Sequence, residues 1–393
     1  MANKDLGAAK TAKKDEFYTQ WADIEREMNA YLEFDKDVFR DRVVLLPCDD
    51  PEWSNFAKFF ALHFQEFGLK KLISTSFAPN SNPAIEEYEP TLFEVESPAY
   101  DPEKSKARGK KFVIDSTDVN GDGRVDIEDL RWQYLDGDGD FRSEEVTALR
   151  EQSDIVITNP PFSLFRTFVD WLVAGDVKFS IIGNMNGVTY KNVFPLIREN
   201  KLWYGPSITS GDREFRVPES YPLTAAGSRV ADDGSKYVRV KGVRWFTNID
   251  HGRRHEPLPL LSEADNKLFN KRVGAAGYQR YENYDAIEVP TTNSIPADYQ
   301  GLMGVPITFL DKYSPEQFEI LGCADYTGLY GSDHLGIGRI GETWMQEYRK
   351  AGGRGHYTAN MTSLVFYDQE SIARPTFKRI VVRHLDPAPR KDA

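Results

Sequence analysis

A short apolar segment that runs directly into two prolines is the clearest sign of chemistry in this sequence. Residues 153–165 read SDIVITNPPFSLF, a strand-like run followed by Asn159, Pro160, Pro161 and Phe162. Proline has no N–H group, so a strand that ends there leaves backbone carbonyls that no neighbouring strand can pair with. The Asn159 side-chain oxygen and the Pro160 carbonyl can each accept a hydrogen bond from one NH₂ group, while the Phe162 ring can stack on a planar base.

Residues 159–162 therefore form a candidate amine clamp, and the chemistry open to such a clamp is group transfer to nitrogen. When both amine protons are held, the nitrogen is drawn toward tetrahedral geometry and its lone pair is exposed. It can then attack an electrophilic methyl group in line without first losing a proton, so positioning and electrostatics supply the catalysis. The simpler alternative is that Asn-Pro-Pro only ends a strand.

The elements that must position this clamp alternate between helix and strand. Apolar periodicity predicts helices at 21–33, 53–67 and 164–174, and strands at 43–46, 71–75, 112–114, 155–157 and 179–182. This alternation predicts an α/β fold with a parallel, doubly wound sheet, in which ligands bind at the carboxyl ends of the strands. Residues 78–140, which are polar, proline-rich and then rich in Asp and Gly, indicate an insertion.

A change of pattern near residue 205 predicts a second region. Beyond it, short strand-like pieces, Tyr- and Pro-rich connections and Arg/Lys groups replace the helical periodicity. We therefore expect one domain at 1–205 and an irregular α+β region at 206–393. The boundary is set only to within tens of residues, because 243–246 could be a strand of the first sheet.

The composition favours an ordered globular protein with an uneven charge distribution. The 393 residues carry a net charge of -12. Residues 1–160 hold 34 acidic against 20 basic side chains, whereas residues 161–393 hold 27 against 29, so the second half can still bind a polyanion. Only Cys48 and Cys323 are present, which argues against a disulfide framework or a cysteine metal site. Without a long apolar run or an apolar leader, we expect a cytoplasmic protein that does not contact membranes.

Several further motifs, taken in order with the clamp, resemble one family. They are KDEFYT at 14–19, LPCDDPEWSNF at 46–56, GDFRS at 139–143, WFTN at 245–248 with HGRRH at 251–255, and MGVPITFLDK at 303–312. Together they resemble the EcoRI-type adenine-specific DNA methyltransferases, amino-methyltransferases that use S-adenosylmethionine. The resemblance covers most of the chain and implies a methyltransferase domain at 1–205 with a Rossmann-like sheet, followed by a target-recognition and DNA-binding region.

The same resemblance assigns cofactor-binding residues. The motif at 14–19 would pack beside the methionine part of the cofactor, the end of the first strand would open onto its pocket, and an Asp-Phe pair would hold its adenine. The residues concerned are Lys14, Asp15, Phe17, Tyr18, Thr19, Pro47, Asp49, Asp50, Asp140 and Phe141.

The chain departs from the usual methyltransferase pattern at two of these cofactor elements. It lacks a Gly-x-Gly turn after the first strand, and its second strand does not end in an acid. Simpler roles are also open to the assigned residues, since the Asp pair can cap a helix and the phenylalanines can belong to the core.

Basic residues interleaved with aromatics at 236–255 are the candidate DNA contacts, because such a pattern suits phosphate binding and base stacking. The alternative is a solvated strand face. The residues chosen are Lys241, Arg244, Arg253, Arg254 and His255.

Residues 118–129 give a competing signal, because their spacing matches a calcium loop. Asp118, Asn120, Asp122, Asp126 and Asp129 fall at loop positions 1, 3, 5, 9 and 12, with glycine at position 6. Position 12 is Asp where Glu is usual, and flanking helices are not evident. The alternatives are a structural calcium ion and an acidic surface loop. The GIGRIG run at 336–341 follows no strand and is not taken as a nucleotide site.

We therefore expect a monomeric enzyme that methylates the exocyclic N6 amine of a flipped-out adenine in double-stranded DNA, with a separate restriction endonuclease as a possible partner. Two other readings stay open. A methyltransferase could act on RNA or on protein glutamine through the same clamp. A non-enzymatic, calcium-dependent binding module could be built on the loop at 118–129.

Overall fold

The computed structural model describes residues 19–389 except 53, 82–87, 89, 126, 210–211, 218–222, 224–226 and 325–328. The chain forms two compact units. The first unit holds the chain through Gly187 together with Tyr204–Gly252, and the second unit holds Val188–Trp203 and the chain from Arg253 onward. Residues 204–252 thus return to the first unit, so the compact units do not divide at residue 205.

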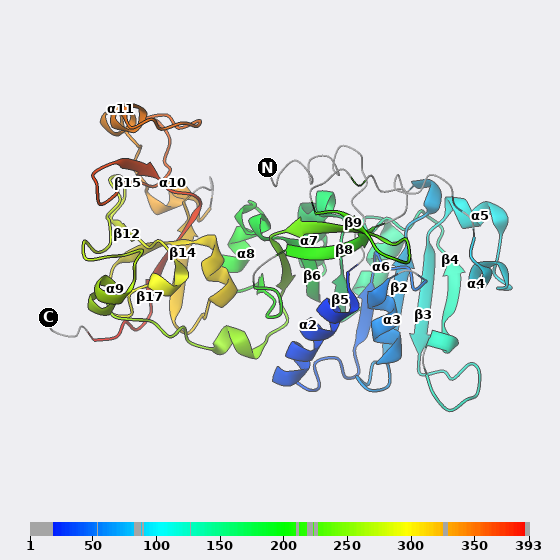
Figure 1. The fold of residues 1–393 in the computed structure, drawn as a ribbon. Coiled ribbons are helices and arrows are strands. Elements are labelled where there is room, and N and C mark those ends of the chain that lie inside the picture. The colour runs from blue at the N-terminus through cyan, green and yellow to red at the C-terminus, as the bar shows by residue number, and fades with distance from the viewer. Residues whose placement is uncertain are drawn as a thin grey trace. The chain divides into compact units, whose positions relative to one another are not determined.

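An eight-stranded mixed sheet organises the first unit (Figure 1). Its order is β4-β3-β2-β1-β5-β6-β11-β7, and the pairs β2–β1, β1–β5 and β5–β6 are parallel. The strands are β1 (Val43–Leu46), β2 (Lys71–Ser76), β3 (Lys110–Asp115), β4 (Arg131–Tyr134), β5 (Ile155–Thr158), β6 (Lys178–Asn184), β7 (Trp203–Tyr204) and β11 (Val243–Thr247).

The strands predicted at 43–46, 71–75, 112–114, 155–157 and 179–182 are confirmed, as is the α/β class. The expectation of a parallel sheet holds only for its centre. Strands β3 and β4 of the insertion form an antiparallel hairpin on β2, and β11 runs antiparallel to β6. The insertion therefore extends the sheet.

Helices cover the sheet on both faces. They include α2 (Trp21–Phe34), α3 (Asn55–Leu62), α6 (Glu144–Glu151) and α7 (Phe165–Ala174). Val44 and Leu46 of β1 belong to the same buried cluster as Ile24 and Phe56 of α2 and α3. The alternate strand residue Leu45 is also fully buried and points to the opposite face. Burial on both faces explains why these strands are continuously apolar.

Helix α3 is shorter than predicted. It begins after Ser54, whose side chain accepts a hydrogen bond from the Phe56 N–H, and it ends at Leu62. Turns then lead to Gly68, which has a φ of +63°. The aromatic residues that extended the helical pattern to residue 67 pack in these turns, since Phe64 and Phe67 are buried.

A buried ion pair holds the insertion together, and a glycine loop ties it to β2. It contains α4 (Leu92–Val95) and α5 (Pro102–Ala107). The ammonium group of Lys110 lies 2.7 Å from a Glu94 carboxylate oxygen, and both side chains are almost fully buried. Gly139, with a φ of +82°, lies so close to the end of β2 that an added Cβ would overlap the Ser76 carbonyl oxygen.

A second sheet of the first unit has the order β8-β10-β9. It comprises β8 (Asp212–Val217), β9 (Arg229–Val230) and β10 (Lys236–Lys241), and β10 is antiparallel to both neighbours. Phe215, Val217, Val238 and Val240 are buried in the main cluster of the unit. The other face of this sheet carries charged residues, as strand alternation requires.

The second unit contains a four-stranded sheet and a two-stranded hairpin. The sheet order is β12-β13-β17-β14, with β12 (Ala286–Glu288), β13 (Leu302–Pro306), β14 (Phe318–Cys323) and β17 (Arg379–His384); the hairpin pairs β15 (Val365–Tyr367) with β16 (Ala373–Pro375). The helices are α8 (Phe194–Arg198), α9 (Glu263–Phe269), α10 (Ser332–Leu335) and α11 (Glu342–Lys350). Arg379 forms a largely buried ion pair with Glu288, to which Tyr281 also donates.

We expect Gly139→Ala to destabilise the protein by roughly 1–3 kcal/mol, because alanine tolerates a positive φ poorly and its Cβ would meet the Ser76 carbonyl. Thermal unfolding of the variant measures this loss. Gly137→Ala is the matched control, because a Cβ at that position in the same loop would meet nothing within 4 Å. Equal unfolding temperatures for both variants would contradict a tight contact between the loop and β2.

Candidate functional site

The amine clamp lies at the carboxyl end of β5, in the centre of the sheet. Asn159 and Phe162 are part-buried and Pro160 is buried. The Pro161 carbonyl accepts a hydrogen bond from the Leu164 N–H at 2.9 Å, which starts the short 3₁₀ turn Phe162–Leu164 before α7. The prolines thus convert a strand into a helix start within a few residues. The clamp function of these residues stays a prediction.

The second sheet of the first unit supports the aromatic residue of the clamp. The ring of Phe162 meets the ring of Phe215 on β8 edge to face, with centroids 6.3 Å apart and an interplanar angle of 88°. Phe215 is itself buried. A residue more than 50 positions away along the chain therefore sets the orientation of the Phe162 ring, as edge-to-face packing does.

The end of β1 lies beside the clamp, because β1 and β5 are neighbouring parallel strands. Asp49 directs its carboxylate toward β5. Its Oδ2 accepts a hydrogen bond from Thr158 Oγ1 at 2.6 Å, and its Oδ1 accepts one from Ser54 Oγ at 2.5 Å. Thr158 is the residue immediately before Asn159 and is fully buried. The predicted cofactor edge and the predicted clamp are thus joined through one carboxylate.

Burial controls the protonation of the two acids at this edge. Loss of water raises the pKa of Asp49 to about 6, although hydrogen bonds from Ser54 and Thr158 oppose the rise. The pKa of Asp50 is also raised to about 6 by burial, against a hydrogen bond from the Glu52 N–H and the nearby charge of Lys110. Both acids carry negative charge at neutral pH in a poorly hydrated place.

The N-terminal motif is described only at its last residue. Lys14, Asp15, Phe17 and Tyr18 lie outside the described residues. Thr19 is buried, and its carbonyl accepts a hydrogen bond from Asn55 Nδ2 at 2.8 Å. The last residue of the motif therefore contacts Asn55, the first residue of α3, next to the N-cap residue Ser54. Pro47 is buried at the end of β1, and its carbonyl accepts from Thr75 Oγ1.

The Asp140–Phe141 pair sits at the end of β2 and is engaged by protein groups. The Ala78 N–H donates to the Asp138 carbonyl at 2.7 Å, which joins the loop to β2. Asp140 forms a bidentate pair with Arg142, which lowers its pKa. The Phe141 ring packs among core aromatics of α7 and is 4% exposed. This burial favours the core role for Phe141, and adenine binding by the pair stays a prediction.

The candidate DNA contacts of the first unit differ in exposure. Lys241, at the end of β10, is exposed. Arg244 is 3% exposed, and its guanidinium donates to the carbonyls of Val243 and Thr209 at 2.8 and 2.9 Å. Arg244 is therefore a structural residue of β11, and its burial argues against a direct contact with DNA. Alternating charge in the sequence could not reveal this, because β11 is buried on both faces.

The other three candidates belong to the second unit and lie on a short 3₁₀ turn, Gly252–His255. The Arg254 guanidinium lies 3.8 Å from the centroid of the Trp203 ring and donates to Asn200 at 3.0 Å. His255 pairs with Glu316 at 2.7 Å. Arg253 is part-exposed. A contact of these residues with DNA stays a prediction.

In the loop at 118–129, acidic side chains accept hydrogen bonds from backbone N–H groups of the same loop. Asp118 accepts from the N–H groups of Gly121 and Gly123, and Asp129 accepts from those of Val119 and Asn120. Asp122 accepts from the Arg124 N–H; Asp126 lies outside the described residues. Within the described part of the chain, no group of three or more His, Cys, Asp or Glu side chains is placed to hold a metal ion. A calcium site is therefore not supported.

Sequence reasoning missed Thr158 and Ser54, the two hydroxyl donors to Asp49. Each had a local signal. Thr158 is the one polar residue of the apolar strand β5, and Ser54 stands in the N-cap position before a helical pattern. Their common partner could not be read from spacing, because Asp49 and Thr158 are 109 residues apart.

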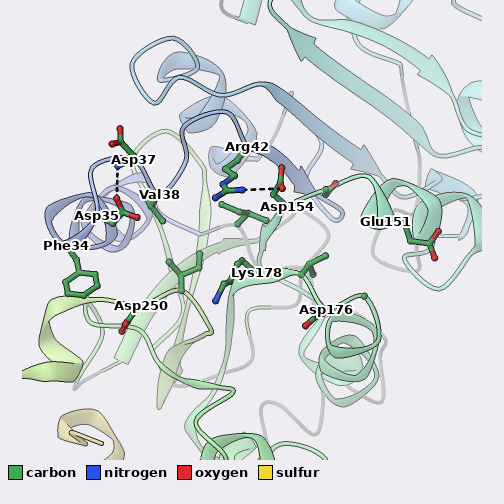
Figure 2. A pocket seen from close by; sticks show the side chains of 15 residues that line it. Phe34, Asp35, Asp37, Val38, Arg42, Glu151, Asp154, Asp176, Lys178 and Asp250 are labelled. Carbon is green, nitrogen blue, oxygen red and sulfur yellow. Dashed lines mark hydrogen bonds and ion pairs between the residues drawn. The ribbon is translucent and has the colours of Figure 1, made fainter. Parts of the chain in front are cut away.

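A pocket of about 490 Å³ opens at the other edge of the sheet, away from the clamp (Figure 2). It is lined by the amino ends of β5 and β6 and the residues before β1, including Arg42, Asp154 and Lys178. Arg42 and Asp154 face each other at 3.6 Å. Ligands of open α/β sheets bind at the carboxyl ends of strands, so this pocket is not the candidate site.

No helix among the described residues is long and apolar enough to cross a bilayer.

Stability should depend on pH through Asp49. Its pKa is raised from 3.8 to about 6 in the folded state, so the folded chain binds more protons than the unfolded chain between these values. Stability from this group therefore falls as pH rises from about 4 to about 6 and is constant above that window. Denaturant titrations across pH should show a shallower slope for Asp49→Asn than for the wild type.

Asp37→Asn is the matched control for this titration. Asp37 is exposed, and its hydrogen bond with Arg40 lowers its pKa, so its removal should leave the slope above pH 4 unchanged. An Asp49→Asn variant that keeps the wild-type slope would contradict the raised pKa.

Comparisons with known proteins identify the family of this chain. The family model described as adenine-specific methyltransferase EcoRI matches residues 5–385. The type II methyltransferase M.EcoRI of Escherichia coli is 44% identical over 319 residues, which cover 81% of this chain and 89% of that protein. M.MpnI of Mycoplasma pneumoniae and M.MgeORF184P of Mycoplasma genitalium, also type II methyltransferases, are 35% and 32% identical over 80% of this chain and 84% of each relative. No solved structure matched the chain.

The family model spans nearly the whole chain, and three relatives exceed 30% identity over most of their own length. The chain belongs to the EcoRI family of adenine-specific methyltransferases.

Proposed function

We propose that this protein is a site-specific DNA methyltransferase that transfers a methyl group from S-adenosylmethionine to the N6 amine of a flipped-out adenine in duplex DNA. Family membership supports the reaction class. The observation that carries the proposal is the position of Asn159–Phe162 at the carboxyl end of a central parallel strand, next to the end of β1.

A Rossmann-like arrangement of the sheet is part of the proposal. From β1 the chain passes to β2 on one side, and after the insertion it enters β5 on the other side. This reversal between β1 and β5 is a topological switch point, where doubly wound sheets bind their ligands. Asp49 is buried and Asp50 part-buried there, and their negative charge fits a ligand that carries a sulfonium and an ammonium group.

The contacts to the cofactor differ from the common methyltransferase pattern. The turn after β1 is Pro47-Cys-Asp-Asp-Pro-Glu52 and has no Gly-x-Gly. Strand β2 ends at Ser76, and the buried acid near that end, Glu94, is already paired with Lys110. Asp50 is therefore the acid best placed to hold the cofactor. When bound, S-adenosylmethionine supplies the electrophilic methyl group.

The residues of the clamp hold and orient the acceptor. The Asn159 side-chain oxygen and the Pro160 carbonyl accept hydrogen bonds from the adenine amine, and the Phe162 ring stacks on the base. Because Phe215 packs on Phe162, the stacking surface is fixed before the base arrives. Flipping an adenine from the duplex costs a few kcal/mol, which base stacking and phosphate contacts offset. A preset geometry keeps the reacting atoms in line.

Lys241, Arg253, Arg254 and His255 are the proposed contacts to DNA, and residues 206–393 are proposed to supply most of the target recognition. Phosphate contacts from basic side chains would make binding depend strongly on salt. A monomeric state, a cytoplasmic location and a separate restriction endonuclease stay predictions. The clamp recognises an NH₂ group and not the polymer that carries it, so the choice of DNA over RNA or protein glutamine rests on family membership. A structural calcium ion is not part of the proposal.

Asn159→Ala should lower kcat on the order of 10²–10³-fold, the usual effect of removing one preorganised group from an active site. The measurement is transfer of tritiated methyl groups from the cofactor to DNA, RNA and protein acceptors. Label is expected in DNA adenine alone, and single-molecule mapping of methylated random DNA would then give the target site.

Asp122→Ala is the control for this experiment and should leave transfer unchanged, because its carboxylate only holds a backbone N–H in the exposed loop. Label that enters RNA or protein in preference to DNA would reject the proposed acceptor. An unaffected Asn159→Ala variant would reject the clamp.

A further inference from the structure

We propose that Asp49 is a positioning residue. Its carboxylate fixes the amine clamp to the end of β1 through Thr158 and is not a ligand of the cofactor. The inference rests on the proposed function, because it names what holds the acceptor site in register with the cofactor edge. It also separates the roles of two adjacent acids, since Asp50 is left to face the ligand.

The first observation is the way the Asp49 carboxylate is occupied. Each of its oxygens accepts one hydroxyl hydrogen bond, from Ser54 at 2.5 Å and from Thr158 at 2.6 Å. The residue is 5% exposed. Each oxygen could still accept a second hydrogen bond, but a carboxylate with almost no exposed surface offers little room for a ligand to reach it directly.

The second observation is that the backbone of Asp49 is fixed on its other side. Its N–H donates to the Thr75 carbonyl at 2.9 Å, and its carbonyl accepts a hydrogen bond from the Ser74 hydroxyl. Thr75 Oγ1 also donates to the Pro47 carbonyl at 2.9 Å. The end of β1 is thus bound to β2, so the carboxylate of Asp49 projects toward β5 from a rigid base.

The third observation links the same carboxylate to helix α3. Ser54 donates its hydroxyl proton to Asp49 and accepts a hydrogen bond from the Phe56 N–H at 3.0 Å. Ser54 therefore serves as helix cap and as carboxylate donor at once. Through Asp49, the start of α3 and the ends of β1, β2 and β5 form one hydrogen-bonded unit.

Thr158 transmits this constraint to the clamp. It is fully buried, β-branched and adjacent to Asn159. A β-branched side chain has few χ1 rotamers, and a bond from its hydroxyl to Asp49 selects one of them. The peptide that leads into Asn159 is thereby held at a fixed distance from β1. Misplacing a reacting group by about 1 Å can cost on the order of 10²-fold in rate.

The test uses the full chain with DNA and S-adenosylmethionine. Thr158→Val keeps the branched shape and removes only the hydroxyl. We expect kcat to fall roughly 10- to 100-fold while KM and the dissociation constant for S-adenosylmethionine change less than about threefold. Thr158→Ser restores the hydroxyl and should recover most of the rate.

Thr247→Val is the matched control. Thr247 is a fully buried threonine on β11 of the same sheet, and its hydroxyl donates to the Phe179 carbonyl at 2.7 Å and accepts from the Ile249 N–H at 2.9 Å. Thr247→Val should lose at least as much thermal stability as Thr158→Val and keep kcat within about threefold of the wild type. A similar fall in kcat for Thr247→Val would show a general loss of stability and overturn the inference.

A double-mutant cycle tests whether Asp49 acts through Thr158. Asp49→Ala removes the carboxylate, and the Asp49→Ala/Thr158→Val chain should lose no more rate than Asp49→Ala alone, because Thr158 has then already lost its acceptor. Additive losses of rate, or a Thr158→Val enzyme with wild-type kcat, would overturn the inference about Asp49 and leave the proposed function in place. Failure of the wild-type chain to methylate DNA would instead reject the proposed function.

Discussion

The carboxylate of Asp49 lies out of water and is stabilised there by two hydroxyl donors from different elements. A buried charge without such partners is costly. Strand β1, strand β5 and helix α3 must therefore keep their relative positions for the charge to remain satisfied. This constraint acts between β1 and β5, where the fold reverses direction and where the candidate chemistry lies.

Two other restraints act on the same corner. The prolines at 160 and 161 remove backbone donors and end β5, and the contact of Phe162 with Phe215 sets the aromatic ring. The hydrogen bond of Thr158, the stiff backbone of the two prolines and the ring packing of Phe162 are independent of one another, yet they converge on five consecutive residues, 158–162. Such convergence is what electrostatic and positional catalysis requires, because groups that are already oriented do not reorganise during the reaction.

The sequence predicted elements best where one local pattern determined them. Strands β1 and β5 are continuous apolar runs buried on both faces, and α2 carries its apolar residues at helical spacing. Contacts between distant segments were not predictable, as the bond between Asp49 and Thr158 and the packing of Phe215 on Phe162 illustrate. The burial of Arg244 was not predictable for a related reason: the sequence of a basic residue in an aromatic strand does not show whether a neighbouring strand covers it.

The first unit is discontinuous in sequence, and this affects how it can be assembled. Trp245 of β11 is fully buried, and its ring meets Phe56 of α3 edge to face. During synthesis on a ribosome, the sheet that holds the clamp is not complete until β11 has left the exit tunnel. By then residues Val188–Trp203, which belong to the second unit, have already been synthesised. A fragment that stops near residue 205 lacks Trp245 and would expose the apolar residues, including Phe56, on which the Trp245 ring packs. Such a fragment is a poor candidate for separate expression.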